Sequence, residues 1–227
     1  MIRRNAVVNG SWLLDYARRG ALLIAGCSLA LATMGASGCS SRTGSGLFGG
    51  FAVPSGTGEV TITRTDGASL KPKFPVAVYR YIDQNTADVY LTDLPLGRLA
   101  DPADQLADLT GTVVHVYVFL VPEAGKTPID PTACNATVRQ VMFVNGARGI
   151  YAGAGFADTA DPGSNNFDAS IINASMRLSA NSPDFADLLG PANLSGRFAA
   201  RLDEETSRAL SDRLAMVSAG LRSAVKK

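Results

Sequence analysis

The chain has 227 residues, with 21 Lys and Arg against 20 Asp and Glu, and a formal net charge of +1. Neither the whole chain nor the part after residue 38 carries the excess of basic residues that dominates nucleic-acid binding, so the composition argues against a nucleic-acid partner. The 3 cysteines are too few for a disulfide framework, and we expect an apolar core to stabilise the fold.

The first 38 residues have the layout of an export signal. Two arginine pairs, at 3–4 and 18–19, precede an apolar run over residues 21–34, and small residues follow that run. The run is shorter than the ~20 apolar residues needed to cross a bilayer. The pattern therefore favours a signal peptide over residues 1–38 that is removed, rather than a permanent membrane anchor.

Residues 36–39, Ala-Ser-Gly-Cys, resemble the lipobox of bacterial lipoproteins, in which small residues precede a cysteine that is lipidated and becomes the new N-terminus. Residues 24–27, Ile-Ala-Gly-Cys, also fit, but cleavage there would leave only about six apolar residues, fewer than the ~7–15 of a signal. The resemblance implies lipidation at Cys39, with Cys27 as the alternative. It also implies a membrane-anchored protein of the bacterial envelope, and Ser40 after the cysteine implies outer-membrane sorting.

Residues 39–57 begin at the lipidated cysteine and are rich in Gly and Ser. A flexible coil of about 18 residues spans on the order of 25 Å, which holds a domain clear of the lipid headgroups. We interpret this stretch as a tether. The remaining residues, 58–227, have the size of one domain.

About eight segments of this domain have the patterns of strands, because they alternate apolar with polar residues or are apolar throughout. They are residues 59–65, 75–82, 87–94, 112–121, 138–144, 148–156, 170–178 and 195–202. Residues 83–86 form a plausible hairpin connection, and Asn145-Gly146 is a strong signal for a tight hairpin. The segments predict an all-β, mainly antiparallel fold, either a single β-sandwich or a small barrel of about eight strands.

Two helices are predicted at the periphery. Ser182 as N-cap, Pro183 and Gly190 bracket a short helix. Asp203 caps a C-terminal amphipathic helix over residues 204–225. Its apolar stripe, expected to pack on the domain, consists of Leu210, Leu214, Val217, Leu221 and Val225.

The candidate ligand face comes from two strands. His115, the single histidine, shares a strand face with Tyr117, and Tyr151 shares one with Gly153 and Gly155. A lone histidine cannot supply the nitrogens usual in catalytic zinc sites, and the chain has no Gly-x-Ser-x-Gly elbow. We therefore interpret His115 as a hydrogen-bonded histidine within or beside the core. We interpret the two glycines as a bulge, a bend or a close backbone approach, with packing under an aromatic ring favoured over a ligand cleft.

Acidic residues gather in two predicted loops. Weak calcium candidates there are Asp101, Asp104, Asp158 and Asp161, because oxygen-rich loops can hold this ion. Neither loop has an EF-hand pattern, and solvated turns are the favoured interpretation. No metal and no cofactor is predicted.

Cys134 is the remaining cysteine once the signal and the lipidated residue are set aside. We expect it to be a small buried apolar side chain, with intermolecular pairing or a reactive thiol as alternatives.

Three functions fit these features. The leading hypothesis is an envelope lipoprotein whose β domain binds or scaffolds a protein or glycan partner without catalysis. A second is an envelope hydrolase acting on a cell-wall or glycan fragment. The third is an accessory lipoprotein of a secretion or surface assembly, which rests on analogy of architecture.

Overall fold

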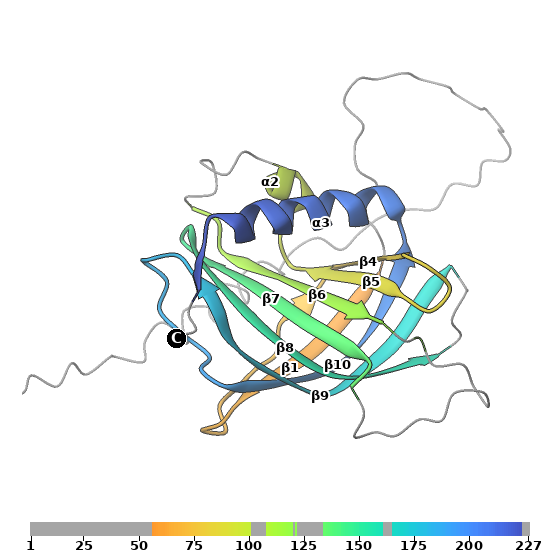
Figure 1. Ribbon diagram of the computed structural model, residues 1–227, viewed down its shortest axis with the longest axis horizontal. Helices are drawn as coiled ribbons and strands as arrows, with labels where there is room; N and C mark the ends of the chain where they lie inside the picture. Colours follow the sequence, from red (N-terminus) through yellow and green to blue (C-terminus); the bar gives the residue numbers. More distant parts are fainter. Residues whose placement is uncertain (1–55, 101–107, 120, 122–133, 161–164, 224–227) are drawn as a thin grey trace, which may run out of the picture. The chain divides into compact units, whose positions relative to one another are not determined.

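The structure, a computed structural model, describes residues 56–100, 108–119, 121, 134–160 and 165–223 (Figure 1). Every described residue belongs to one compact unit, which lies within Gly49–Lys227. Several predictions therefore fall outside the described residues: the signal, lipidation at Cys39 or Cys27, most of the tether, and the calcium candidates Asp101, Asp104 and Asp161.

One mostly antiparallel sheet dominates the described unit. Its 11 strands follow the order β11-β9-β8-β7-β6-β5-β4-β10-β1-β2, with β3 beside β1. The strands are β1 (Thr57–Arg64), β2 (Ser69–Leu70), β3 (Lys73–Phe74), β4 (Val76–Tyr81), β5 (Ala87–Thr92), β6 (Gly111–Val118), β7 (Ala136–Val144), β8 (Ala147–Ala160), β9 (Asn166–Asn181), β10 (Ala192–Leu202) and β11 (Arg222–Ser223).

The sheet closes almost completely into a ring, visible in Figure 1 as the curved wall running from β4 through β8 and β9 to β10. Successive strands from β4 to β10 pair antiparallel. The end of β10 then pairs parallel with β4, at Arg201↔Val78 and Leu202↔Tyr79. The rest of that β10 edge pairs with β1. The all-β prediction is confirmed, and the single continuous sheet follows its small-barrel alternative.

The predicted strands correspond to β1 and to β4 through β10. The hairpin at Asn145-Gly146 is also confirmed: both residues have positive φ, 48° and 80°, and they join Val144 to its cross-strand partner Ala147. This is the backbone of a type I′ turn, whose twist matches that of the strands it connects.

The inside of the ring is filled with side chains. Every strand from β3 to β10, together with β1, contributes to one buried apolar cluster. Its largest members, each at most 2% exposed, are Phe74, Tyr79, Tyr151 and Phe167. Because these aromatic side chains occupy the interior, a ligand has to bind on the outer surface or at the rims of the ring.

A second apolar cluster lies on the outer face, where α3 (Glu204–Ala219) and the short α2 (Leu96–Ala100) cover part of the sheet (Figure 1). The predicted cap is confirmed, since Asp203 accepts a hydrogen bond from the backbone N–H of Thr206 at 2.9 Å. The predicted stripe is buried along the helix, at Leu210, Leu214 and Val217. The helix ends at Ala219 with Gly220 as its C-cap, so the predicted bound of residue 225 was too long.

The predicted helix over residues 182–190 is wrong, because this segment forms turns instead. Its backbone is bonded to a distant side chain: the hydroxyl of Tyr151 accepts hydrogen bonds from the N–H groups of Leu188 and Leu189, at 3.0 and 3.2 Å. The same hydroxyl donates to Asp187 at 2.7 Å. These N–H groups therefore do not bond to carbonyls of the preceding turn, as a helix requires.

Candidate functional site

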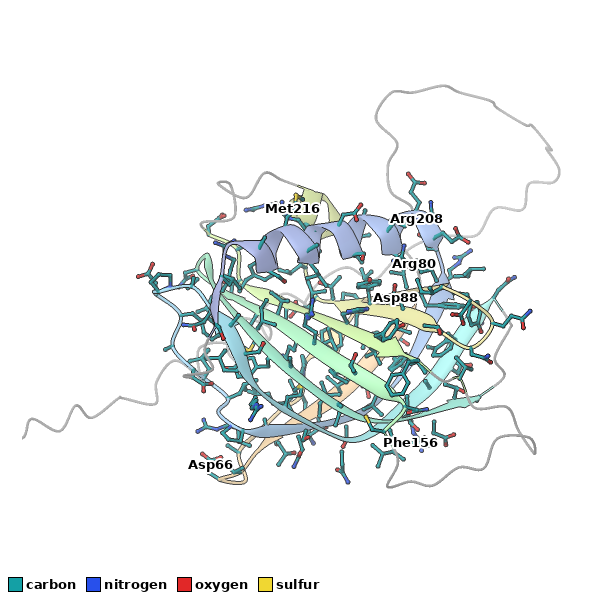
Figure 2. The ribbon with its side chains drawn as sticks, viewed as in Figure 1. Asp66, Arg80, Asp88, Phe156, Arg208 and Met216 are labelled. Atoms are coloured by element: carbon teal, nitrogen blue, oxygen red, sulfur yellow. The ribbon has the colours of Figure 1, made fainter. Side chains whose placement is uncertain are left out.

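A charged cluster lies on the outer face of the sheet, beneath the first turns of α3. Figure 2 shows two of its members, Arg80 on β4 and Asp88 on β5, below the helix segment that carries Arg208. Arg80 and Asp88 face each other across the β4–β5 hairpin, and Tyr90 faces His115 across β5 and β6. Alternate residues of a strand share a face, so this register gathers all four side chains on one surface.

Asp88 is the centre of the cluster. Its Oδ2 accepts hydrogen bonds from Nε and Nη2 of Arg80, at 3.1 and 2.9 Å. Its Oδ1 accepts from Nε2 of His115 at 2.8 Å. The Asp88 side chain is 8% exposed, against 19% for Arg80 and 20% for His115. A carboxylate this buried is stable in its charged form because both oxygens have donors.

The environment shifts the pKa of Asp88 downward. Burial alone would raise that pKa, but the hydrogen bonds and the charges of His115 and Arg80 outweigh burial and lower it. Burial raises the pKa of the Tyr90 phenol, against the opposing effect of its hydrogen bond with Ser211 on α3. The cluster therefore keeps an ionised carboxylate and a neutral phenol through the physiological pH range.

His115 is held from two directions. Its ring is stacked on Tyr90, with centroids 4.6 Å apart and planes 6° from parallel, while Nε2 is engaged by Asp88. Among the described residues, no hydrogen bond joins His115 to a serine or cysteine side chain. Asp88 and His115 thus form the acid–histidine pair found in a nucleophilic triad, with no serine or cysteine of the described residues bonded to the ring. The prediction of a hydrogen-bonded histidine beside the core is confirmed.

The predicted ligand face is divided between opposite surfaces of the sheet. His115 and Tyr117 lie on the outer face of β6, each partly buried. Tyr151 on β8 is 0% exposed and belongs to the interior cluster. The hydroxyl of Tyr151 bonds to the 182–190 turns, through Asp187 and the N–H groups of Leu188 and Leu189.

The two glycines on β8 mark a close approach to the backbone of β9. A methyl group at Gly153 would overlap the carbonyl oxygen of Ser175, and one at Gly155 would lie 2.6 Å from atoms of Ala174. The β8–β9 register shifts between Ala154 and Phe156. Of the sequence interpretations, bulge and close backbone approach are confirmed; packing under an aromatic ring is not what this contact shows.

Asp158 is the calcium candidate that lies within the described residues, where it is exposed at the end of β8. Within this part of the chain, no group of three or more His, Cys, Asp or Glu side chains is placed to hold a metal ion. Likewise, none of its helices is long and apolar enough to cross a membrane. The expectation that Cys134 is buried was wrong, because the residue is exposed, two positions before β7 begins at Ala136.

Arg80 and Asp88 were not among the predicted site residues. The connection over residues 83–86 was predicted as a hairpin, and counting outward from it pairs Tyr81 with Asp88, whereas the structure pairs Tyr81 with Ala87 and Arg80 with Asp88. The observed connection is one residue longer, and only this register places the opposite charges of Arg80 and Asp88 at directly paired positions. The participation of His115 required the β5–β6 register, which the intervening residues 93–110 leave undetermined.

No protein-family model matches this chain, and no curated protein resembles it at a significant level. The function proposed below therefore rests on the residues of this chain.

Proposed function

We propose that this chain is a membrane-anchored lipoprotein of the bacterial envelope. The outer surface of its β domain binds or scaffolds a partner and does not catalyse a reaction. The anchoring part rests on the lipobox at residues 36–39 and the Gly- and Ser-rich stretch that follows it. The domain then acts at the outer membrane, on a protein or glycan within reach of the tether.

The observation that carries the non-catalytic part is the environment of His115. This residue is the only histidine of the chain, and histidine is the side chain whose ordinary pKa best suits acid–base work near neutral pH. Here its ring is stacked on Tyr90 and its Nε2 is bonded to Asp88, which Arg80 also binds. A histidine committed to such a cluster stabilises the outer face of the sheet.

The filled interior of the ring supports a surface-binding role. The side chains of Tyr79, Tyr151 and Phe167 belong to the apolar core that fills the interior. The surface that remains for a partner is the outer face of the strands. A rigid scaffold of this kind suits recognition by surface residues and their loops.

Anchoring is tested by mass spectrometry of the mature N-terminus and by membrane fractionation. We expect a diacylglyceryl group on Cys39, and we expect Cys39→Ser to accumulate as an unprocessed precursor. Cys134→Ser is the matched control and should be processed normally. A diacylglyceryl group on Cys27, or a mature chain without lipid, would contradict this part of the proposal.

The binding role is tested against the hydrolase alternative with a panel of peptidoglycan and glycan fragments. We expect no turnover by the purified lipidated protein, and co-purification of a partner after mild detergent extraction. Turnover that disappears in a folded His115→Ala variant would refute the non-catalytic role. Co-purification with components of a secretion machine would assign the domain to such an assembly.

A further inference from the structure

A groove of about 520 Å³ crosses the sheet on the side of the ring formed by β8, β9, β10 and β1. Three consecutive residues from each strand line it: 158–160 of β8, 168–170 of β9, 197–199 of β10 and 57–59 of β1. The volume falls within the ~300–1,000 Å³ of small-ligand sites. The groove is separate from the His115 cluster, which lies on β4, β5 and β6.

The strand register places charged groups along this groove in one row. Glu59 pairs with Arg197, Arg197 pairs with Ser170, and Ser170 pairs with Asp158. Asp168 lies two residues before Ser170 on β9 and pairs with Ala199 of β10. Neighbouring strands are ~4.8 Å apart, so Arg197 is one strand spacing from Glu59 and about 10 Å from Asp158.

The charged side chains of the groove are unengaged. In the described part of the chain, neither Arg197 nor the carboxylates of Glu59, Asp158 and Asp168 form an ion pair or a side-chain hydrogen bond. Glu59 and Arg197 occupy directly paired positions, where opposite charges ordinarily attract each other, but they form no ion pair. Because the four charged side chains are exposed and unpaired within the described residues, their hydrogen-bonding groups are available to a ligand, beside the small side chains of Ser170 and Ala199.

We propose that this groove binds a short peptide that carries two ammonium groups and one free carboxylate. The guanidinium of Arg197 presents a planar fork of donors that matches a carboxylate. The carboxylates of Glu59, Asp158 and Asp168 accept hydrogen bonds from ammonium groups on either side of it. Three carboxylates against one guanidinium give the lining an excess of negative charge, so the ligand carries more positive than negative groups.

This inference names the ligand of the proposed binding domain, and it rests on that proposed function for its setting in the envelope. Two sources supply the same chemistry: a cell-wall peptide, which ends in a D-amino acid, and a protein-derived peptide, which ends in an L-amino acid. The dipeptides Lys–D-Ala and Lys–L-Ala have the required groups and differ only in this respect.

The test is calorimetric titration of the full-length protein in detergent with each dipeptide. We expect saturable binding with a dissociation constant below about 1 mM for at least one of them, and the tighter one identifies the source. Arg197→Gln should weaken binding at least ~10-fold, and Asp168→Asn should weaken it several-fold. The exposed residues Arg177 and Asp184 lie outside the groove, and Arg177→Gln and Asp184→Asn should bind as the wild type does.

Amide-capped Lys-Ala separates the contribution of the carboxylate. It should bind the wild type at least ~10-fold more weakly than the free acid, and Arg197→Gln should not weaken it further. Absence of saturable binding to about 10 mM for both dipeptides would overturn the inference, as would equal losses in the groove and control variants. The titration does not depend on lipidation, so its failure is distinguishable from a failure of anchoring, which mass spectrometry reports.

Discussion

The imidazole of His115 lies flat against the ring of Tyr90, with the ring centroids 4.6 Å apart. The stack fixes the plane of the imidazole while Nε2 donates to Asp88 at 2.8 Å. Tyr90 also belongs to the outer apolar cluster, together with Leu210 and Leu214 of α3. The charged cluster thus adjoins the packing of the helix on the sheet, and changes in the cluster should be measurable as changes in stability.

Asp88→Asn should lower the free energy of unfolding by about 2–3 kcal/mol. The carboxylate accepts three hydrogen bonds from Arg80 and His115, and a neutral amide of the same size leaves those donors partly unmatched. The partners are 19% and 20% exposed, so we expect less than the ~3–5 kcal/mol of a fully buried pair. Urea denaturation followed by circular dichroism measures the loss.

The control for this variant is Asp184→Asn, an exposed aspartate in the 182–190 turns. It should change stability by no more than about 0.5 kcal/mol. A loss at Asp88 as small as that of the control would mean that the cluster does not stabilise the sheet.

The same carboxylate predicts a dependence on acid pH. The pKa of Asp88 is lowered in the folded protein, so the ionised carboxylate stabilises the fold fully at pH values above the unfolded pKa of about 4. This stabilisation is lost as the pH falls through the folded pKa. The stability difference between wild type and Asp88→Asn should therefore be full at pH 6 and shrink as pH falls below about 4. Urea midpoints at several pH values measure this difference, and one that stays constant with pH would contradict the pKa shift.

The strands were predictable because the alternation that defines them is local to each segment. The turn at Asn145-Gly146 and the cap at Asp203 were predictable for the same reason, because a tight turn depends on the backbone angles of its own residues and a cap on a hydrogen bond to a neighbouring N–H group. The closure of β10 on β4 was not predictable, because parallel pairing at Arg201 and Val78 joins segments more than 120 residues apart. The groove was missed for the same reason, since its lining comes from four strands whose lateral order the sequence does not fix.

The 182–190 segment shows how a distant side chain overrides a local signal. Ser182, Pro183 and Gly190 are sound helix-boundary residues, but the hydroxyl of Tyr151 takes the N–H groups of Leu188 and Leu189. The residues of the segment give no signal of this hydrogen-bond partner, because Tyr151 lies on β8.

Tyr151→Phe should therefore destabilise the protein by about 1.5–3 kcal/mol. The ring remains in the core, but removal of the hydroxyl leaves the two N–H groups without their acceptor and removes one of the donors to Asp187, which keeps its hydrogen bond from the N–H of Gly190. Hydrogen exchange should accelerate selectively at residues 188 and 189, which separates a local effect from global destabilisation. Tyr117→Phe is the control, because the Tyr117 hydroxyl makes no hydrogen bond with the described residues; equal effects of the two variants would rule out the proposed role of the hydroxyl.

Gly153→Ala should destabilise the protein by about 1–3 kcal/mol, through overpacking. The added methyl group would overlap the Ser175 carbonyl oxygen, which belongs to the backbone of β9 and cannot rotate away as a side chain would. Relief requires β8 and β9 to separate near their register shift at Ala154–Phe156. Gly97→Ala in α2 adds the same methyl group where nothing lies within 4 Å, and it should be neutral or stabilising by up to ~1 kcal/mol. If urea denaturation gave the two alanine variants equal stability, the close approach of β8 and β9 would not be a constraint on the fold.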